Sequence, residues 1–332
     1  MSGKRLVVIA LVIAGLALLT VLPVLVQSDS IINLAILALL YIALASSWNV
    51  LGGYTGQTNL GHAAFFGLGS LTTRLLWLSV GWPLPLSLLA GGVVAVVFAL
   101  LVGAPAFKLR GVYFAIGTLA LAQVLNMTVG NMFPMITSLP AEYLATYQLA
   151  PRYYLFLGLA LLTVGTAYVL VHSRLGLGMM AVREEEEAAE SLGVSAFRHK
   201  LLALSVSAFF AGLTGGAFAF YHVGYYPQFP FGPVWTFDSM MMAYIGGTGT
   251  IIGPIIGAVF FVVAKELLAL NLLELHLTVF GTLFILVVLF LPGGLVEAWG
   301  RIRRVLARRA RAREVRLASP EQASGHQTVV GL

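Results

Sequence analysis

The stretch Arg183-Glu184-Glu185-Glu186-Glu187-Ala188-Ala189-Glu190-Ser191-Leu192-Gly193, preceded by Arg174-Leu175-Gly176-Leu177-Gly178, is a strongly charged island between two long apolar runs. A segment this polar must lie in water or against another protein, because lipid cannot solvate its charges. Its centre holds Glu and Ala, which favour helix, and its last glycine suits a helix C-cap. Apolar residues at three- to four-residue spacing predict one short amphipathic helix with a stripe formed by Leu177, Met180, Ala181, Ala188 and Leu192.

Two interpretations of this island stay open on the residues alone. In one, the helix is a solvated loop that caps a bundle. In the other, it docks into a groove of a partner protein, for which short amphipathic helices are well suited. The charged island alone does not decide between these two interpretations, so the decision depends on the rest of the chain.

Composition places the chain in the membrane. Hydrophobic residues make up 59% of its 332 residues and charged residues 10%, whereas an ordinary soluble domain carries about 25% charged residues. We therefore predict an all-α polytopic integral membrane protein. The absence of cysteine removes disulfides and thiolate chemistry. The net charge of +6 comes mostly from the tail after residue 301, so it concerns membrane sidedness and predicts no nucleic-acid partner.

The apolar runs predict about ten transmembrane helices, since about 20 apolar residues cross a bilayer. They lie at 6–26, 31–50, 63–77, 84–104, 112–132, 153–172, 201–223, 235–245, 254–270 and 275–291. Residues 1–300 would thus form one transmembrane domain with the charged loop 174–200. Residues 301–332 would form a basic tail that contacts anionic lipid headgroups and ends in disorder.

Basic residues in short loops predict the sidedness of the chain. The N-terminus, Lys108 with Arg110, the loop 174–200 and the basic tail are placed in the cytoplasm, which leaves 131–152 and the loop at Tyr225 outside. Arg74 fits least well, because it falls late in an outward-running span. We interpret it as snorkelling or lining an aqueous mouth.

Two glycine-rich breaks interrupt the apolar runs, one in each half of the chain, at 51–62 and 246–250. Paired breaks of this kind in corresponding halves predict an internal pseudo-repeat and a transport path between its halves. Close packing of helices through small residues explains the same glycines, and the two interpretations are compatible. The glycines that define the pattern are Gly53, Gly56, Gly61, Gly247, Gly249, Gly253 and Gly257.

Few ionisable residues lie in the predicted spans, which disfavours a carrier coupled to protons or sodium. The chain has no G-x-x-x-x-G-K-[ST] phosphate loop, so energy for active transport would come from another subunit. Its histidines lack metal-ligand spacing and its serines lack a nucleophile elbow, so no metal site or catalytic set is predicted. Polar residues in or beside the spans are the candidates for the translocation path, and they are Gln57, Asn59, His62, Gln123, Asn126 and Asp238.

A series of stretches between residues 31 and 297 carries a family resemblance. They lie at 47–56 (SWNVLGGYTG), 61–70 (GHAAFFGLGS), 109–119 (LRGVYFAIGTL), 176–193, 200–203 (KLLA), 246–258 (GGTGTIIGPIIGA) and 292–295 (PGGL). In this order they resemble the LivM-type permeases of branched-chain amino acid ABC importers. That family usually has a T-G-G-x-x-G stretch in the outer loop before the sixth span, whereas residues 131–152 contain no glycine.

The resemblance implies a set of partners. The permease would pair with a second, LivH-like permease, sit above two ATP-binding subunits, and receive substrate from an extracytoplasmic substrate-binding protein. Glu187-Ala188-Ala189 with Gly193 is similar to the EAA-x-x-x-G loop of ABC importer permeases, which implies that this helix and the nearby Arg183 contact the ATPase. ATP would bind to those subunits, so no cofactor is expected in this chain.

The sequence thus predicts the permease subunit of an ABC importer for branched-chain or similar apolar amino acids, in the cell (inner) membrane with both termini cytoplasmic. An alternative is a channel or facilitator for small polar solutes, such as amides or urea, that needs no ATP. A membrane-embedded enzyme is disfavoured because the sequence offers no catalytic set.

Overall fold

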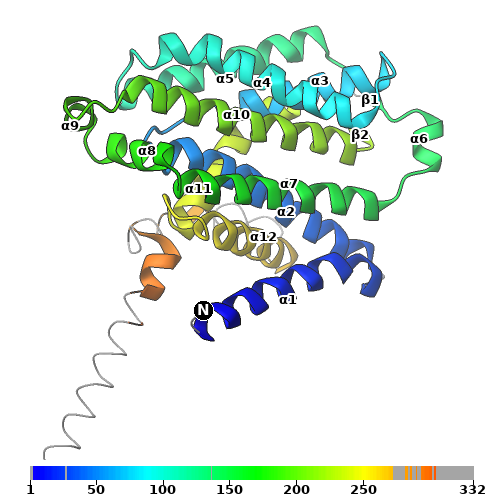
Figure 1. Ribbon diagram of the computed structural model, residues 1–332. Coiled ribbons are helices and arrows are strands. Elements are labelled where there is room, and N and C mark those ends of the chain that lie inside the picture. Colours follow the sequence, from blue (N-terminus) through cyan, green and yellow to red (C-terminus); the bar gives the residue numbers. More distant parts are fainter. Residues whose placement is uncertain are drawn as a thin grey trace, which may run out of the picture.

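The computed structural model describes residues 3–26, 28–135, 137–271 and 293–300, together with positions 281–282, 285, 289 and 303. Over these residues the chain is helical apart from one two-stranded sheet, and its long helices run side by side in a bundle (Figure 1). The elements are α1 (Gly3–Leu25), α2 (Asp29–Gly52), α3 (His62–Leu78), α4 (Leu84–Ala106), α5 (Val112–Met132), β1 (Thr137–Ser138), α6 (Ala141–Ala145), α7 (Leu149–Val171), α8 (Arg174–Glu184), α9 (Glu186–Ser191), α10 (Ala196–Tyr221), β2 (Gly224–Tyr225), the 3-10 helix η1 (Phe229–Phe231), α11 (Pro233–Gly246) and α12 (Gly253–Asn271).

The predicted spans agree closely with these helices. Nine of the ten coincide with α1–α5, α7 and α10–α12, with ends that differ by a few residues. In the described part of the chain, α2, α4, α5, α7 and α10 are long and apolar enough to cross a membrane. The prediction of an all-α polytopic membrane protein is confirmed. The number ten stays a prediction, because the span at 275–291 and the tail at 301–332 lie largely outside the described residues.

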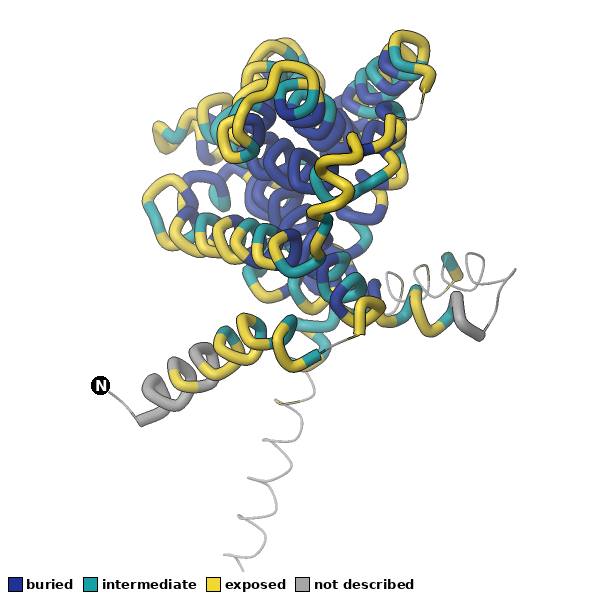
Figure 2. Tube along the Cα trace, turned by 90° about the vertical axis from the view of Figure 1, so that its right-hand side faces the viewer, coloured by how far each residue is buried: buried dark blue, intermediate teal, exposed yellow. Residues whose placement is uncertain are grey.

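The core of the bundle lies around α10, which packs against α2, α3, α4 and α7. Figure 2 shows buried residues concentrated there, while α1 stands apart with much exposed surface. An aromatic cluster of Phe66, Phe218 and Trp235 has ring centroids 4.8 to 5.3 Å apart. A methyl group added at Gly69 would overlap the carbonyl oxygen of Gly212, so α3 and α10 touch backbone to backbone. Small residues therefore set the helix spacing here.

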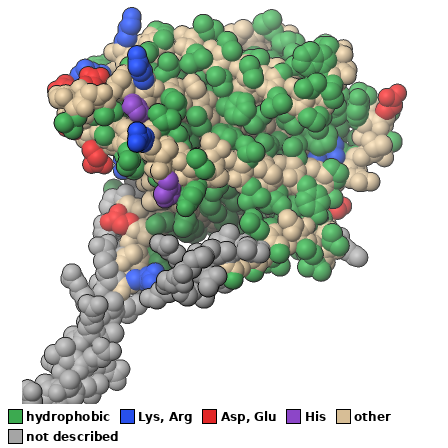
Figure 3. Space-filling model, in the orientation of Figure 1, with side chains coloured by type: hydrophobic (Ala, Val, Ile, Leu, Met, Phe, Trp, Pro, Cys, Tyr) green, Lys and Arg blue, Asp and Glu red, His purple; other side chains and the backbone are tan. Residues whose placement is uncertain are grey.

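The surface of the bundle differs between its flanks and its ends. Figure 3 shows mostly hydrophobic side chains along the flank, and Lys, Arg, Asp, Glu and His gathered mainly at the end where α8 and α9 lie. The strands β1 and β2 and helix α6 lie at the opposite end (Figure 1). A chain with apolar flanks and polar ends is what a bilayer requires.

The strand pair joins two loops that the sequence analysis placed on the same side. β1 and β2 are antiparallel, with Thr137 opposite Tyr225 and Ser138 opposite Gly224. Ser70 donates a hydrogen bond to the Tyr225 hydroxyl at 3.0 Å. Burial raises the pKa of Tyr225 to about 12, so its hydroxyl stays protonated at neutral pH. The predicted outer loops thus form one connected platform.

The interpretation of Arg74 as a snorkelling or mouth-lining residue is wrong. Its side chain is buried, with 4% of the residue exposed. The guanidinium donates to the carbonyl oxygens of Ala219 at 2.9 Å, His222 at 3.2 Å, Val223 at 3.3 Å and Thr137 at 3.4 Å. It therefore ties the end of α10 to both loops of the platform, because its several N–H groups can satisfy carbonyls that no helix pairs.

Replacing Arg74 with Met should destabilise this end of the bundle. Each hydrogen bond to a charged group contributes roughly 1.5–3 kcal/mol, so we expect a loss on the order of 3 kcal/mol, seen as a fall of several degrees in thermal unfolding in detergent. The exposed Arg198 is the matched control, and Arg198→Met should leave the unfolding temperature nearly unchanged. Equal unfolding temperatures for both variants would contradict the anchoring role.

Candidate functional site

The charged island folds as two helices, not the one that the sequence predicted. Glu185 is extended, with φ −156° and ψ 109°, and it separates α8 from α9. In one continuous helix, Glu184 would lie beside the like-charged Glu187 three residues on, which favours a break. The break also turns α9 so that Ala189 packs against Val182 and Ala196 in a small apolar cluster.

The predicted apolar stripe is therefore divided, with Leu177, Met180 and Ala181 on α8 and Ala188 on α9. Leu177 is 63% exposed and Leu192 is 86% exposed. The buried residues of α8 are instead Gly176, Gly178, Met179 and Val182. Gly176 lies against the Leu170 carbonyl and Gly178 against the His199 ring, so the absence of side chains at both lets α8 lie close to its neighbours.

The predicted glycine C-cap is confirmed. Gly193 has φ +85°, the left-handed region that glycine adopts without strain. Its N–H donates to the Glu190 carbonyl at 2.9 Å, and the Val194 N–H donates to the Ala189 carbonyl at 3.0 Å. This pair of hydrogen bonds is the Schellman pattern, which ends α9 sharply and turns the chain into α10.

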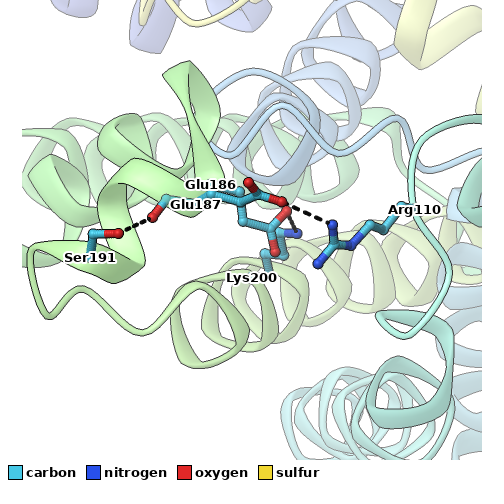
Figure 4. A network of polar contacts seen from close by, with 5 residues as sticks. All are labelled: Arg110, Glu186, Glu187, Ser191 and Lys200. Atoms are coloured by element: carbon cyan, nitrogen blue, oxygen red, sulfur yellow. Dashed lines mark hydrogen bonds and ion pairs between the residues drawn. The ribbon is translucent and has the colours of Figure 1, made fainter.

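Two ion pairs hold α9 in place (Figure 4). Lys200, only 4% exposed, pairs with Glu186 and so has its buried charge compensated. Arg110 pairs with Glu187 at 3.4 Å, but both side chains are 77% exposed, so this contact contributes little. Ser191 donates to the Glu187 backbone carbonyl at 2.9 Å.

The exposed surface at α9 combines two carboxylates with two apolar side chains. Glu187, Ala188, Glu190 and Leu192 are all exposed. An exposed leucine surrounded by carboxylates, on a short helix fixed from behind by packing and an ion pair, is suited to contact with another protein. We call these four residues the α9 face.

Arg183 has a different position from the rest of the predicted ATPase contact. Its Nη1 donates to the Gly53 carbonyl at 2.8 Å, inside the first glycine break. A methyl group added at Gly249 would overlap the same Nη1 and would lie 3.1 Å from the Gly53 oxygen. Arg183 therefore lies in the seam between the two breaks, and it points to the bundle.

Asn49, near the end of α2 just before the first break, binds the backbone of the second break, and it was not among the residues predicted from the sequence. Its Nδ2 donates to the Thr250 carbonyl at 2.9 Å, and its Oδ1 accepts from the Gly249 N–H at 2.9 Å. Asn49 is 1% exposed. One amide side chain thus satisfies a donor and an acceptor of a non-helical segment, as buried irregular backbone requires. The only sequence signal was its place in the stretch 47–56.

The glycines of the two breaks serve different purposes. A methyl group at Gly253 would overlap the Gly247 carbonyl, and one at Gly257 would overlap the Met242 carbonyl, so these glycines let α11 and α12 pack closely. Gly61 lies against the Thr118 backbone in the same way. Small-residue packing is therefore confirmed for these positions, while Gly249 belongs to the seam. The pseudo-repeat itself stays a prediction.

The polar residues predicted for the path lie in different surroundings. His62 is fully buried, 3.0 Å from the Ser47 hydroxyl. Asn59 is 1% exposed, and its Oδ1 accepts from the Gly61 N–H at 2.8 Å. Gln57 and Gln123 are half-buried. For these four residues, a role in the path stays a prediction.

Asn126 and Asp238, by contrast, line one cavity of about 400 Å³ between α2, α5, η1, α11 and α12. We call it the Asp238 cavity. Its other walls include residues that the sequence analysis did not propose, namely Tyr41, Gln228, Trp235 and Lys265. No local pattern marks these as neighbours, since they come from segments up to 224 positions apart (265 − 41).

Comparisons with known proteins agree on one family. Residues 30–288 match the family described as branched-chain amino acid transport system / permease component. The chain is 29% identical over 301 residues to the high-affinity branched-chain amino acid transport system permease protein LivM of Escherichia coli (strain K12), covering 81% of this chain and 70% of that protein. It is also 29% identical over 306 residues to LivM of Salmonella typhimurium, covering 82% and 71%. No solved structure matches the chain.

Replacing Gly249 with Ala should disturb the seam between the two breaks. Gly249 has φ +76°, which costs an L-residue about 1–2 kcal/mol, and the new methyl would displace Arg183. We expect a lower unfolding temperature and faster amide exchange in 51–61 and 247–252. Gly165, in α7 with open space around it, is the control, and Gly165→Ala should not destabilise the chain. Unchanged exchange in Gly249→Ala would contradict the seam.

Proposed function

This chain belongs to the branched-chain amino acid ABC permease family, and on that premise we propose that its α9 face is the surface through which separate ATP-binding subunits drive import. As a permease component it is a non-catalytic transporter subunit, and in this family ATP hydrolysis belongs to other subunits. The ATP-independent channel considered above gains no support from either comparison. The remaining question is how the ATP-binding subunits transmit movement to the helices of the bundle.

The observation that carries the proposal is that α8 and α9 together expose one surface to a partner and contact the bundle with another. Outward, Glu187, Ala188 and Leu192 are exposed to a partner. Inward, Arg183 binds the Gly53 carbonyl at 2.8 Å, next to Gly249. A displacement of the α9 face would therefore act on both glycine breaks through one side chain. These breaks are where α2 meets α3 and α11 meets α12.

The sidedness follows from the same geometry. If α9 contacts an ATPase, the end of the bundle with α8 and α9 is cytoplasmic, and the platform of β1, β2 and α6 faces outward (Figure 1). Cytoplasmic Lys108 and Arg110 agree with the positive-inside rule. Both termini would then be cytoplasmic in the inner membrane, with the basic tail at 301–332 near anionic lipid.

The partners proposed are those of an assembled importer. A second, LivH-like permease would complete the path, two ATP-binding subunits would bind below, and an extracytoplasmic substrate-binding protein would dock on the outward platform. The platform suits docking because Arg74 and the strand pair hold its two loops in a fixed relation. Gln57, Asn59, His62 and Gln123 remain proposed path residues beside Asn126 and Asp238.

The variant Glu187→Arg should abolish co-purification of the ATP-binding subunits and ATP-driven uptake, because it reverses charge at the centre of the α9 face. Glu142→Arg is the matched control, since Glu142 is equally exposed but lies on α6 at the opposite end. Arg110→Gln removes the ion pair with Glu187 without changing the face, and should have little effect. Co-purification and uptake that both survive Glu187→Arg would exclude this docking surface.

The variant Arg183→Met should separate docking from transport. The α9 face is untouched, so the ATP-binding subunits should still co-purify, whereas the contact with Gly53 is lost. Coupling free energies of 1–3 kcal/mol correspond to about 5–150-fold, and we expect ATP-driven uptake to fall by at least about tenfold. Arg183→Lys keeps a charged donor and should retain part of the uptake. Full uptake in Arg183→Met would rule out the transmission role.

A further inference from the structure

The Asp238 cavity holds two opposite charges that are not paired with each other. Asp238 on α11 is 8% exposed, and its Oδ2 accepts a hydrogen bond from the Tyr41 hydroxyl at 3.1 Å. Lys265 on α12 lines the same cavity, with its Nζ 5.4 Å from the Phe261 ring centroid. The ion pairs found among the described residues are Arg110–Glu187 and Lys200–Glu186, so none joins Asp238 to Lys265.

The remaining polar groups of the cavity wall bind one another. Gln228 donates to the Asn126 side-chain oxygen at 3.0 Å, and its own side-chain oxygen accepts from the Tyr226 hydroxyl at 2.8 Å. The Trp235 indole N–H donates to the Phe229 carbonyl at 3.1 Å. These contacts leave the carboxylate and the ammonium as the groups with capacity for a ligand.

The rest of the wall is aromatic. The rings of Tyr41 and Trp235 have centroids 5.9 Å apart. The volume of about 400 Å³ falls in the roughly 300–1,000 Å³ range of small-molecule sites. A cavity with one carboxylate, one ammonium and aromatic walls is complementary to a molecule that carries both charges and an apolar side chain. Asp238 is buried and Lys265 half-buried, and with no direct ion pair between them each would gain a partner from such a molecule but none from an uncharged solute.

We propose that the Asp238 cavity binds the transported amino acid as a zwitterion, with its ammonium on Asp238, its carboxylate on Lys265 and its side chain against Tyr41 and Trp235. This inference rests on the proposed function, and it assigns the substrate class to residues of the permease itself. The site is electrically neutral and the zwitterion is too, so binding adds no net charge to the membrane interior. Lys265 is a specificity-determining residue that the polar pattern of the sequence did not mark.

The absence of cysteine in this chain gives a direct test. Val234 lines the cavity and is 61% exposed, so Val234→Cys in the assembled importer without ATP provides a single maleimide target among this chain's residues. We expect millimolar leucine to slow its labelling. Leucinamide lacks the carboxylate of leucine and 4-methylpentanoate lacks its ammonium, so each should protect at least about tenfold less. Val80→Cys, which is 59% exposed in the turn after α3 and is not part of the cavity wall, should be labelled at the same rate with and without leucine.

Second substitutions in the Val234→Cys background identify the charges involved. Lys265→Met and Asp238→Asn should each abolish protection by leucine, whereas Glu266→Gln, an exposed carboxylate next to Lys265, should leave it unchanged. Equal protection by leucine, leucinamide and 4-methylpentanoate, or protection that survives Lys265→Met, would overturn the zwitterion site.

The outcomes separate this inference from the proposed function. Protection does not depend on the α9 face, so Glu187→Arg should retain it even where uptake is lost. An importer that takes up leucine with ATP but shows no protection at saturating leucine would overturn the cavity site and leave the proposed function standing.

Discussion

The structure depends on how two stretches of irregular backbone are satisfied inside an apolar bundle. Neither lipid nor a neighbouring strand can pair their N–H and C=O groups, so local backbone turns and side chains do it. Asn49 binds both the N–H of Gly249 and the carbonyl of Thr250, and Arg183 binds the carbonyl of Gly53. The two breaks, about 200 positions apart in sequence, therefore form one polar seam, and the surrounding helices are arranged about it.

The contact of Arg183 with this seam distinguishes the α8–α9 loop from a simple cap on the bundle. A loop helix that only capped the bundle would need no contact with the backbone of the breaks. Here the loop has an exposed acidic surface and an arginine that binds the Gly53 carbonyl, and the Lys200–Glu186 ion pair joins α9 to α10. In the coupling that we propose, the packing of Val182, Ala189 and Ala196 would pass a displacement of α9 on to α8. The opposite end is held in the same manner by Arg74.

Much of the fold was readable in the sequence because the membrane imposes simple rules. Apolar length predicted the helices, and Gly193 predicted the end of α9. Where the sequence analysis failed, the missing information was tertiary. Arg74 was interpreted as facing water because its carbonyl partners come from two distant segments, 219–223 and Thr137. The island was predicted as one helix because its periodicity does not show that Ala189 packs on Val182 and Ala196.

By itself the sequence determined an all-α membrane protein with a charged loop, two glycine breaks and a family resemblance that the comparisons bear out. These features follow from composition and local sequence pattern, because the preference of each segment for lipid or water depends on its own residues. Only the tertiary structure decided that the breaks meet, that Arg183 enters their seam, and that Asp238 and Lys265 share a cavity. Such pairings depend on which helix faces pack together, and no periodicity within one segment encodes them.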